Sequence, residues 1–121
     1  MRVYVLLAAV LFLSACSSQK TSPDTTISGK ASWYGARHHG KQTASGERFN
    51  QHALTAAHRS LAFGTRVKVT NTLNNKSVTV RVNDRGPYSK GRVIDLSRAA
   101  ANKIDMINSG VVPVRVQVLS K

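Results

Sequence analysis

Hydrophobic and polar residues alternate in two neighbouring stretches near the middle of the chain. Residues 65–70 and 77–82 place a valine at every second position, which is the period of a β-strand with one buried face. The intervening residues 71–76 are mostly polar and rich in asparagine, a composition typical of a turn. The pattern therefore predicts a β-hairpin.

Shorter stretches of this kind follow one another along the rest of the chain. Further strands are predicted at residues 30–34, 54–57, 93–96 and 112–119. Ser97 is a favourable N-cap, and the alanine-rich residues 98–104 after it are typical of a short helix. Many short strands and one helix favour a small closed β-barrel, because closure leaves no exposed strand edge.

The first residues have the pattern of an exported lipoprotein. A positive start is followed by the apolar residues 3–13, too few to span a bilayer, and by Leu-Ser-Ala-Cys at residues 13–16. This tetrapeptide resembles the bacterial lipobox, so Cys16 is predicted to be the lipidated first residue of the mature protein. Because it is the only cysteine, no disulfide within the chain is expected.

Three segments follow from this interpretation. Residues 1–15 are expected to be the lipoprotein signal peptide, and residues 16–28, rich in Ser and Thr, a flexible tether. Residues 29–121 then form one folded domain. Lipid on Cys16 would anchor this domain in the cell envelope, facing the periplasm, and Ser17 after it fits the sorting pattern of outer-membrane lipoproteins.

The chain carries a large excess of positive charge. Its 18 Lys and Arg residues outnumber its 5 Asp and Glu residues, which gives a formal net charge of +13. Such a balance favours an anionic partner, which can be nucleic acid, lipid headgroups or an acidic polymer of the cell wall. Export excludes nucleic acid as a natural partner.

Acidic residues are few enough to be weighed one by one. They are Asp24, Glu47, Asp84, Asp95 and Asp105. Asp24 and Asp105 lie in the tether and beyond the helix, where solvated surface roles are expected. Asp95 lies between two apolar residues of a predicted strand, which favours a structural hydrogen-bonding role over chemistry. Asp84 and Glu47 lie in turn or loop segments, where each alone is an ordinary polar residue.

The histidines raise the question of a metal site. They are His38, His39, His52 and His58. The sequence has no HExxH motif and no paired cysteines, so we expect no metal. It also lacks a GxSxG nucleophile motif and a phosphate-binding glycine fingerprint, so no cofactor is expected.

Seven short motifs occur in a fixed order along the predicted domain. They are ASWYG at residues 31–35, TASGE at 43–47, LTAAH at 54–58, FGT at 63–65, VTN at 69–71, NDRGP at 83–87 and RVIDLS at 92–97. Together they resemble the rare lipoprotein A (RlpA-like) family from Gly29 to near Leu119. The resemblance implies a mainly β fold, a small six-stranded double-psi β-barrel with one or two short helices, in agreement with the strand pattern.

The resemblance also implies an activity. Active members of the family are lytic transglycosylases that cleave peptidoglycan between N-acetylmuramic acid and N-acetylglucosamine. They prefer glycan strands without stem peptides and leave 1,6-anhydro-muramic acid ends. Many relatives carry a C-terminal SPOR domain, whereas this chain stops at Lys121, so recruitment to division-site proteins by that route is not expected.

The family's catalytic residues fall on three positions of this chain, Asp84, Glu47 and His58. Lytic cleavage needs an acid for the glycosidic oxygen and then a base for the C6 hydroxyl, and one carboxylate can serve both steps. We expect Asp84 to be that group, Glu47 to stabilise positive charge on the sugar, and His58 to orient a carboxylate. The roles of the two carboxylates are interchangeable at this stage.

Aromatic and cationic residues near these motifs are candidates for substrate binding. They are Trp33, Tyr34, Arg85 and Tyr88. The aromatic rings would offer faces to sugars, and the guanidinium a donor to substrate oxygens. The alternative to cleavage is a non-catalytic lipoprotein that binds glycan strands, as expansins do in loosening cell walls. An envelope scaffold that binds only proteins is a third reading.

Overall fold

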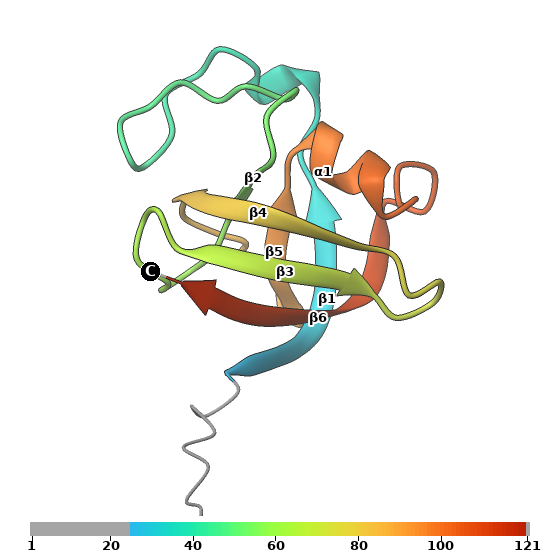
Figure 1. The fold of residues 1–121 in the computed structure, drawn as a ribbon. Coiled ribbons are helices and arrows are strands. Elements are labelled where there is room, and N and C mark those ends of the chain that lie inside the picture. The colour runs from blue at the N-terminus through green and yellow to red at the C-terminus, as the bar shows by residue number, and fades with distance from the viewer. Residues whose placement is uncertain (1–24, 121) are drawn as a thin grey trace, which may run out of the picture.

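The computed structural model describes residues 25–120 as six strands, a short α-helix and a single 3₁₀ turn (Figure 1). In chain order they are β1 (Thr26–Trp33), η1 (Ala36–His38), β2 (Thr55–Ala57), β3 (Arg66–Asn71), β4 (Ser77–Asp84), β5 (Arg92–Leu96), α1 (Arg98–Lys103) and β6 (Val111–Ser120). The predicted signal peptide and the lipidation site at Cys16 lie outside these residues. Within 25–120, no helix has the length and apolarity needed to cross a membrane.

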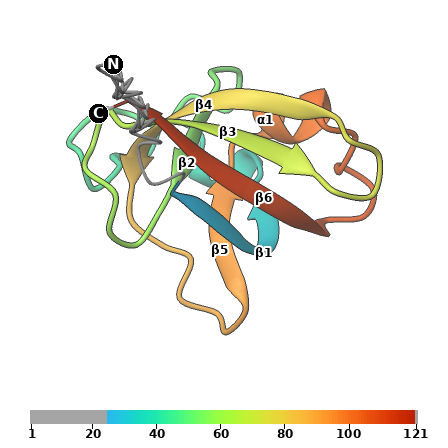
Figure 2. The ribbon, with the colours of Figure 1, turned by 60° about the horizontal axis from the view of Figure 1, so that its bottom comes forward.

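The strands close into a barrel in the order β1-β5-β2-β4-β3-β6, with β6 paired back onto β1 (Figures 1 and 2). The β1–β5 and β2–β4 pairs are parallel, whereas the other four pairs are antiparallel. The predicted six-stranded, mainly β barrel is therefore confirmed.

The domain begins earlier than Gly29, the position where we expected it to start. β1 begins at Thr26, which pairs with Gln117 of β6, and the ladder continues through Ile27 and Ser28. These residues were assigned to the tether because their composition is polar. They nevertheless form part of the strand, because their pairing with β6 uses backbone hydrogen bonds and does not depend on polar or apolar side chains.

The predicted hairpin is confirmed as β3 and β4. Val67 pairs with Val80 and Val69 with Val78, and all four side chains are buried. At the turn, Asn71 binds with both backbone and side chain: its N–H donates to the carbonyl of Lys76 at 2.8 Å, and its Nδ2 donates to that of Ile104 at 2.9 Å.

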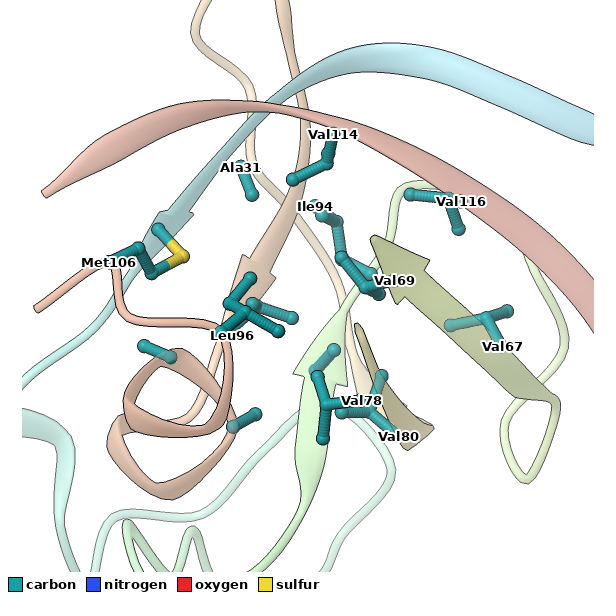
Figure 3. Close-up of a cluster of buried hydrophobic side chains, with 14 of the residues drawn as sticks. Ala31, Val67, Val69, Val78, Val80, Ile94, Leu96, Met106, Val114 and Val116 are labelled. Carbon is teal, nitrogen blue, oxygen red and sulfur yellow. The ribbon is translucent and has the colours of Figure 1, made fainter. Parts of the chain in front are cut away.

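Side chains from all sides of the barrel meet in one apolar core (Figure 3). Ile94 and Leu96 of β5 point inward together with Ala31 of β1 and the valines of β3, β4 and β6. Met106, which follows α1, packs against the same cluster. Because side chains alternate along a strand, the residues between these positions face outward. Asp95 is therefore on the outer wall.

The long connection between β1 and β2, residues 34–54, crosses one end of the barrel beside α1 (Figure 1). It is held there by Ser97, whose hydroxyl donates to the carbonyl of Ala53 at 2.6 Å and accepts from Ala100 N–H at 3.2 Å as the helix N-cap. Buried Phe49 packs on Tyr34, with ring centroids 4.4 Å apart.

The core predicts the outcome of one matched pair of substitutions. Leu96→Ala removes a fully buried side chain and is expected to lower the free energy of unfolding by about 2–5 kcal/mol. Leu73→Ala is the control, because Leu73 is 73% exposed, and we expect a change within about 0.5 kcal/mol. Urea unfolding followed by circular dichroism measures both, and equal losses would contradict this core assignment.

Candidate functional site

Asp84 ends β4 at the point where the 34–54 connection meets the barrel. Its Oδ1 accepts hydrogen bonds from the N–H of Ala44 at 2.9 Å and of Arg85 at 2.8 Å. Its carbonyl accepts from the N–H of His58 at 3.1 Å. Three segments that are distant in sequence are thus joined at this residue.

A pocket of about 160 Å³ opens beside Asp84 on the outer wall of the barrel. It is lined by Tyr34, His38, Ala57, Asp84, Arg85 and Asp95. Of the predicted site residues, the pocket brings together Asp84, Tyr34 and Arg85. Asp95 and His38 were not among them.

The strand register explains how two aspartates reach one pocket. Ala57 of β2 is paired with Asp84 of β4 on one side and with Asp95 of β5 on the other. Neighbouring strands lie about 4.8 Å apart, so the two aspartate backbones are separated by about 10 Å. Only the methyl group of Ala57 lies between them on this wall.

Asp95 is half-buried and accepts a hydrogen bond from the hydroxyl of Ser32, its partner across the β1–β5 pair. Burial raises the pKa of the Asp95 carboxyl above its ordinary value of 3.8, and the charge of Asp84 acts in the same direction. The Ser32 hydrogen bond and the positive charge of Arg92 act against this rise. The expected structural hydrogen bond is present, but the residue also faces the pocket.

Tyr34 forms the wall of the pocket opposite the strands. Its hydroxyl is buried and has no hydrogen-bond partner among residues 25–120. Burial raises the pKa of this hydroxyl, and the charges of Asp84 and Asp95 raise it further. The Tyr34 ring packs against His38, with centroids 5.3 Å apart. The pocket therefore contains a neutral donor that a ligand oxygen can satisfy.

Glu47 lies outside the pocket lining and is held by two neighbours on β4. Arg81 donates from Nη1 and Nη2 to its two carboxylate oxygens, both at 2.9 Å, and Asn83 Nδ2 donates to Oε1 at 2.6 Å. The Arg81 and Asn83 hydrogen bonds lower the pKa of Glu47 below its ordinary value of 4.5. Glu47 is therefore an ionised anchor.

The anchor fixes the loop of residues 43–47 on the end of β4. Ser45 N–H donates to the carbonyl of Asn83 at 3.3 Å, and Thr43 closes the loop through two hydrogen bonds to the carbonyl of Glu47, both at 2.8 Å. Gly46 supplies a positive φ of 91° that this tight turn requires. Through this loop the Ala44 N–H is directed at Asp84.

His58 is buried at the end of β2, where its ring Nδ1 accepts from the N–H groups of Ser60 and Leu61, both at 3.1 Å. Burial lowers the pKa of the ring, and the charges of Arg59 and Arg85 lower it further. We expected the ring to bind a carboxylate. Its link to Asp84 instead runs through the main chain, and the ring shapes the following turn.

Arg85 follows Asp84 and lies at the edge of the pocket. Its Nη1 donates to the carbonyls of His58 at 3.2 Å and Leu61 at 2.8 Å, and the guanidinium lies 4.0 Å above the Phe63 ring. Both contacts hold the side chain in place. Arg85 thus ties the residues after β2 to the site.

The other two predicted binding residues do not line the pocket. Trp33, at the end of β1, is half-buried and packs against the core cluster. Tyr88 is 77% exposed and belongs to the connection between β4 and β5, which projects from the barrel (Figure 2). Its ring is open to an extended ligand.

No group of three or more His, Cys, Asp or Glu side chains in residues 25–120 is arranged to hold a metal ion. Two histidines, His39 and His52, pack against each other with ring centroids 5.7 Å apart. The Nδ1 of His39 accepts from the N–H of Gln51 at 3.2 Å.

The fold has close structural relatives. It is similar to the Streptomyces papain inhibitor, with a TM-score of 0.64 at 22% identity over 80% of this chain and 97% of that one. It is also similar to an expansin from Clavibacter michiganensis, with a TM-score of 0.62 at 22% identity over 79% of this chain and 51% of that one. These likenesses define a protein of the double-psi β-barrel class.

The sequence narrows this class to one family. The family model described as lytic transglycolase matches residues 26–116, and the chain belongs to this family, among its RlpA-like members. It is 60% identical over 94 residues to the endolytic peptidoglycan transglycosylase RlpA of Campylobacter jejuni, covering 78% of this chain and 34% of that protein. The corresponding Vibrio cholerae protein is 54% identical over 95 residues, covering 78% and 36%. The chain thus spans about a third of the length of these relatives.

The contacts of Glu47 with Arg81 and Asn83 predict how the Glu47 carboxyl titrates. Because the folded pKa of Glu47 is depressed, the contacts with Arg81 and Asn83 are complete above pH 4.5 and are lost as pH falls through the folded pKa. Carboxyl NMR should give a Glu47 midpoint below 4.5, and Arg81→Gln should return it toward that value. An unchanged midpoint in Arg81→Gln would show that this pair does not hold the loop.

Proposed function

We propose that this protein is an endolytic lytic transglycosylase that cleaves the bond between N-acetylmuramic acid and N-acetylglucosamine in peptidoglycan. Its membership of the lytic transglycolase family and the activity for which its RlpA relatives are named support this assignment. The observation that carries it is the pocket beside Asp84, whose carboxylate is fixed by Ala44 and bordered by a tyrosine hydroxyl with no hydrogen-bond partner among residues 25–120.

The reaction suits a site of this composition. Lytic cleavage needs no external nucleophile, because the C6 hydroxyl of the muramic acid closes on its own C1 and leaves a 1,6-anhydro end. The protein has only to transfer protons and to hold the sugar, and neither task needs a metal or an organic cofactor. We propose glycan strands without stem peptides as the substrate. In such strands no peptide on the muramic acid hinders contact between the sugar and the outer wall of the barrel.

Asp84 exchanges a proton with the substrate in this proposal, and His58 and Glu47 position it. His58 binds the main chain of Asp84, while Glu47 holds the loop that carries the Ala44 N–H. This differs from the role that we expected for Glu47, namely stabilising charge on the sugar. Both carboxylate oxygens of Glu47 are bonded to Arg81, and Glu47 does not line the pocket.

The aromatic residues give the strand its binding surface. The Tyr34 hydroxyl donates to a sugar oxygen in the pocket, and the exposed ring of Tyr88 stacks on a sugar outside it. Trp33 packs against the core, and Arg85 lies at the pocket edge. Positive charge over the rest of the domain favours the anionic cell wall.

Replacing Asp84 tests the activity directly. The full chain, purified in detergent, is incubated with sacculi that are either intact or stripped of stem peptides by an amidase, and mass spectrometry measures anhydro-ended fragments. Asp84→Asn is expected to lower their release by about 10²–10⁴-fold, because a proton-transfer group is lost. Co-sedimentation with the strands should be unchanged, since the amide keeps the size of the carboxyl.

Two controls accompany this assay. Asp105→Asn removes an exposed carboxylate that pairs with Lys76 and does not line the pocket, and its release of fragments should equal that of the unmodified chain. Circular dichroism checks that each variant folds. Co-sedimentation without anhydro fragments from the unmodified chain would assign the protein as a glycan-binding barrel.

The lipid anchor has its own test. We expect the full chain to be labelled by radioactive palmitate in cells and to fractionate with the membrane, and Cys16→Ala to lose both properties. Retention of label in Cys16→Ala would reject Cys16 as the acylation site.

A further inference from the structure

Asp95 lines the same pocket as Asp84, and the two residues occupy equivalent positions on the two strands that flank β2. Ala57 is the register partner of both residues, so the two carboxyls leave the wall from the strands on either side of β2. Asp95 alternates with the inward side chains of Ile94 and Leu96, and its own side chain therefore projects into the pocket side of the wall.

The surroundings of the two carboxyls differ. Asp84 accepts two backbone N–H hydrogen bonds on Oδ1, from Ala44 and Arg85, so it acts there as an acceptor. Asp95 accepts a hydrogen bond from the Ser32 hydroxyl, and its partial burial raises its pKa. A carboxyl whose protonated form is favoured by burial, next to one that accepts N–H hydrogen bonds, can divide acid and base roles with it.

The groups that face Asp95 come from every element around it. They are Ser32 on β1, Tyr34 after β1, His38 on η1, Asp84 on β4 and Arg92 on β5 itself. The negative charge of Asp84 favours the protonated form of Asp95, which is the form that an acid needs.

We propose that Asp95 is a second catalytic residue, the acid that protonates the glycosidic oxygen, while Asp84 is the base that receives the C6 hydroxyl proton. This inference rests on the proposed function. The Asp95 proton moves to the oxygen that leaves with N-acetylglucosamine as the C1–O4 bond breaks. The C6 oxygen bonds to C1, and its proton passes to Asp84. No water is consumed, and exchange of protons with solvent restores both carboxyls.

This division replaces the scheme in which one carboxylate serves as acid and then base. A single group has to turn between the leaving oxygen and the C6 hydroxyl. Two groups on opposite sides of Ala57 can face both reacting oxygens at once. Tyr34 lines the same pocket as both aspartates, and its hydroxyl is the group that orients the sugar in this proposal.

The test compares three variants of the full chain on amidase-stripped sacculi. Asp95→Asn keeps the acceptor oxygen for Ser32 but has no proton of carboxylic acidity, and we expect anhydro-fragment release to fall by about 10²–10⁴-fold. Asp105→Asn is the matched control and should retain full release, because its backbone, with a φ of 54°, suits asparagine. Ser32→Ala should give an intermediate loss and shift the high-pH limb of the pH–rate profile upward, because the Ser32 hydrogen bond lowers the pKa of Asp95.

The pH–rate profile separates catalysis from structural support. The unmodified chain is expected to lose activity at high pH as Asp95 ionises. In Asp95→Asn the residual activity should lose its high-pH decline. A residual profile with the same shape as that of the unmodified chain would overturn the proposal.

A measurement on the resting protein needs no activity. Carboxyl NMR should show Asp95 titrating above its ordinary range, with a midpoint that falls in Asp84→Asn because the neighbouring charge is removed. A full rate in folded Asp95→Asn overturns the role of Asp95 and leaves the proposed function intact. Absence of anhydro fragments from the unmodified chain overturns the proposed function, and the role of Asp95 with it.

Discussion

The register of β2 is the constraint on which the site depends. This strand has only three residues, yet it pairs parallel with β4 and antiparallel with β5. Its central position sets which residues of the two longer strands stand opposite each other. A shift by one residue would turn Asp84 or Asp95 into the core and an apolar side chain outward. The inward residue Ala56 and its buried neighbours prevent such a shift.

The strands supply one side of the pocket, and loop residues complete its lining. The 34–54 connection brings Tyr34 and His38 over the wall, and it is attached through Ser97 and the loop anchored by Glu47. Ser97 follows β5, and the partners of Glu47 lie on β4. The pocket is therefore formed by residues from several strands and from the 34–54 connection, with Ala57 of β2 at its centre.

Much of the barrel could be predicted from the sequence. The hairpin followed from valines at every second position, and the short helix from Ser97 and the alanines after it. The start of β1 could not be predicted in this way, since Thr26 is ordered by backbone pairing with Gln117, and polar composition gives no sign of that.

The candidate site was only partly visible in the sequence. Asp84 stood out because it is followed by a sharp turn, but the partner of Glu47 is Arg81, 34 residues away, and such a pair has no local signal. Asp95 was judged structural because apolar residues flank it. That argument locates the neighbours in the core but does not reveal what covers the outer face of the strand, which depends on the path of a loop without hydrophobic periodicity.

The two alanines of β2 limit how this barrel can vary. Ala56 is confined by the core and Ala57 by the space between two acidic side chains, and both are almost completely buried. A larger side chain at the first position would split the barrel, and one at the second would close the pocket. Changes in the loops should therefore be tolerated more readily than changes at Ala56 and Ala57, where a larger side chain has no room.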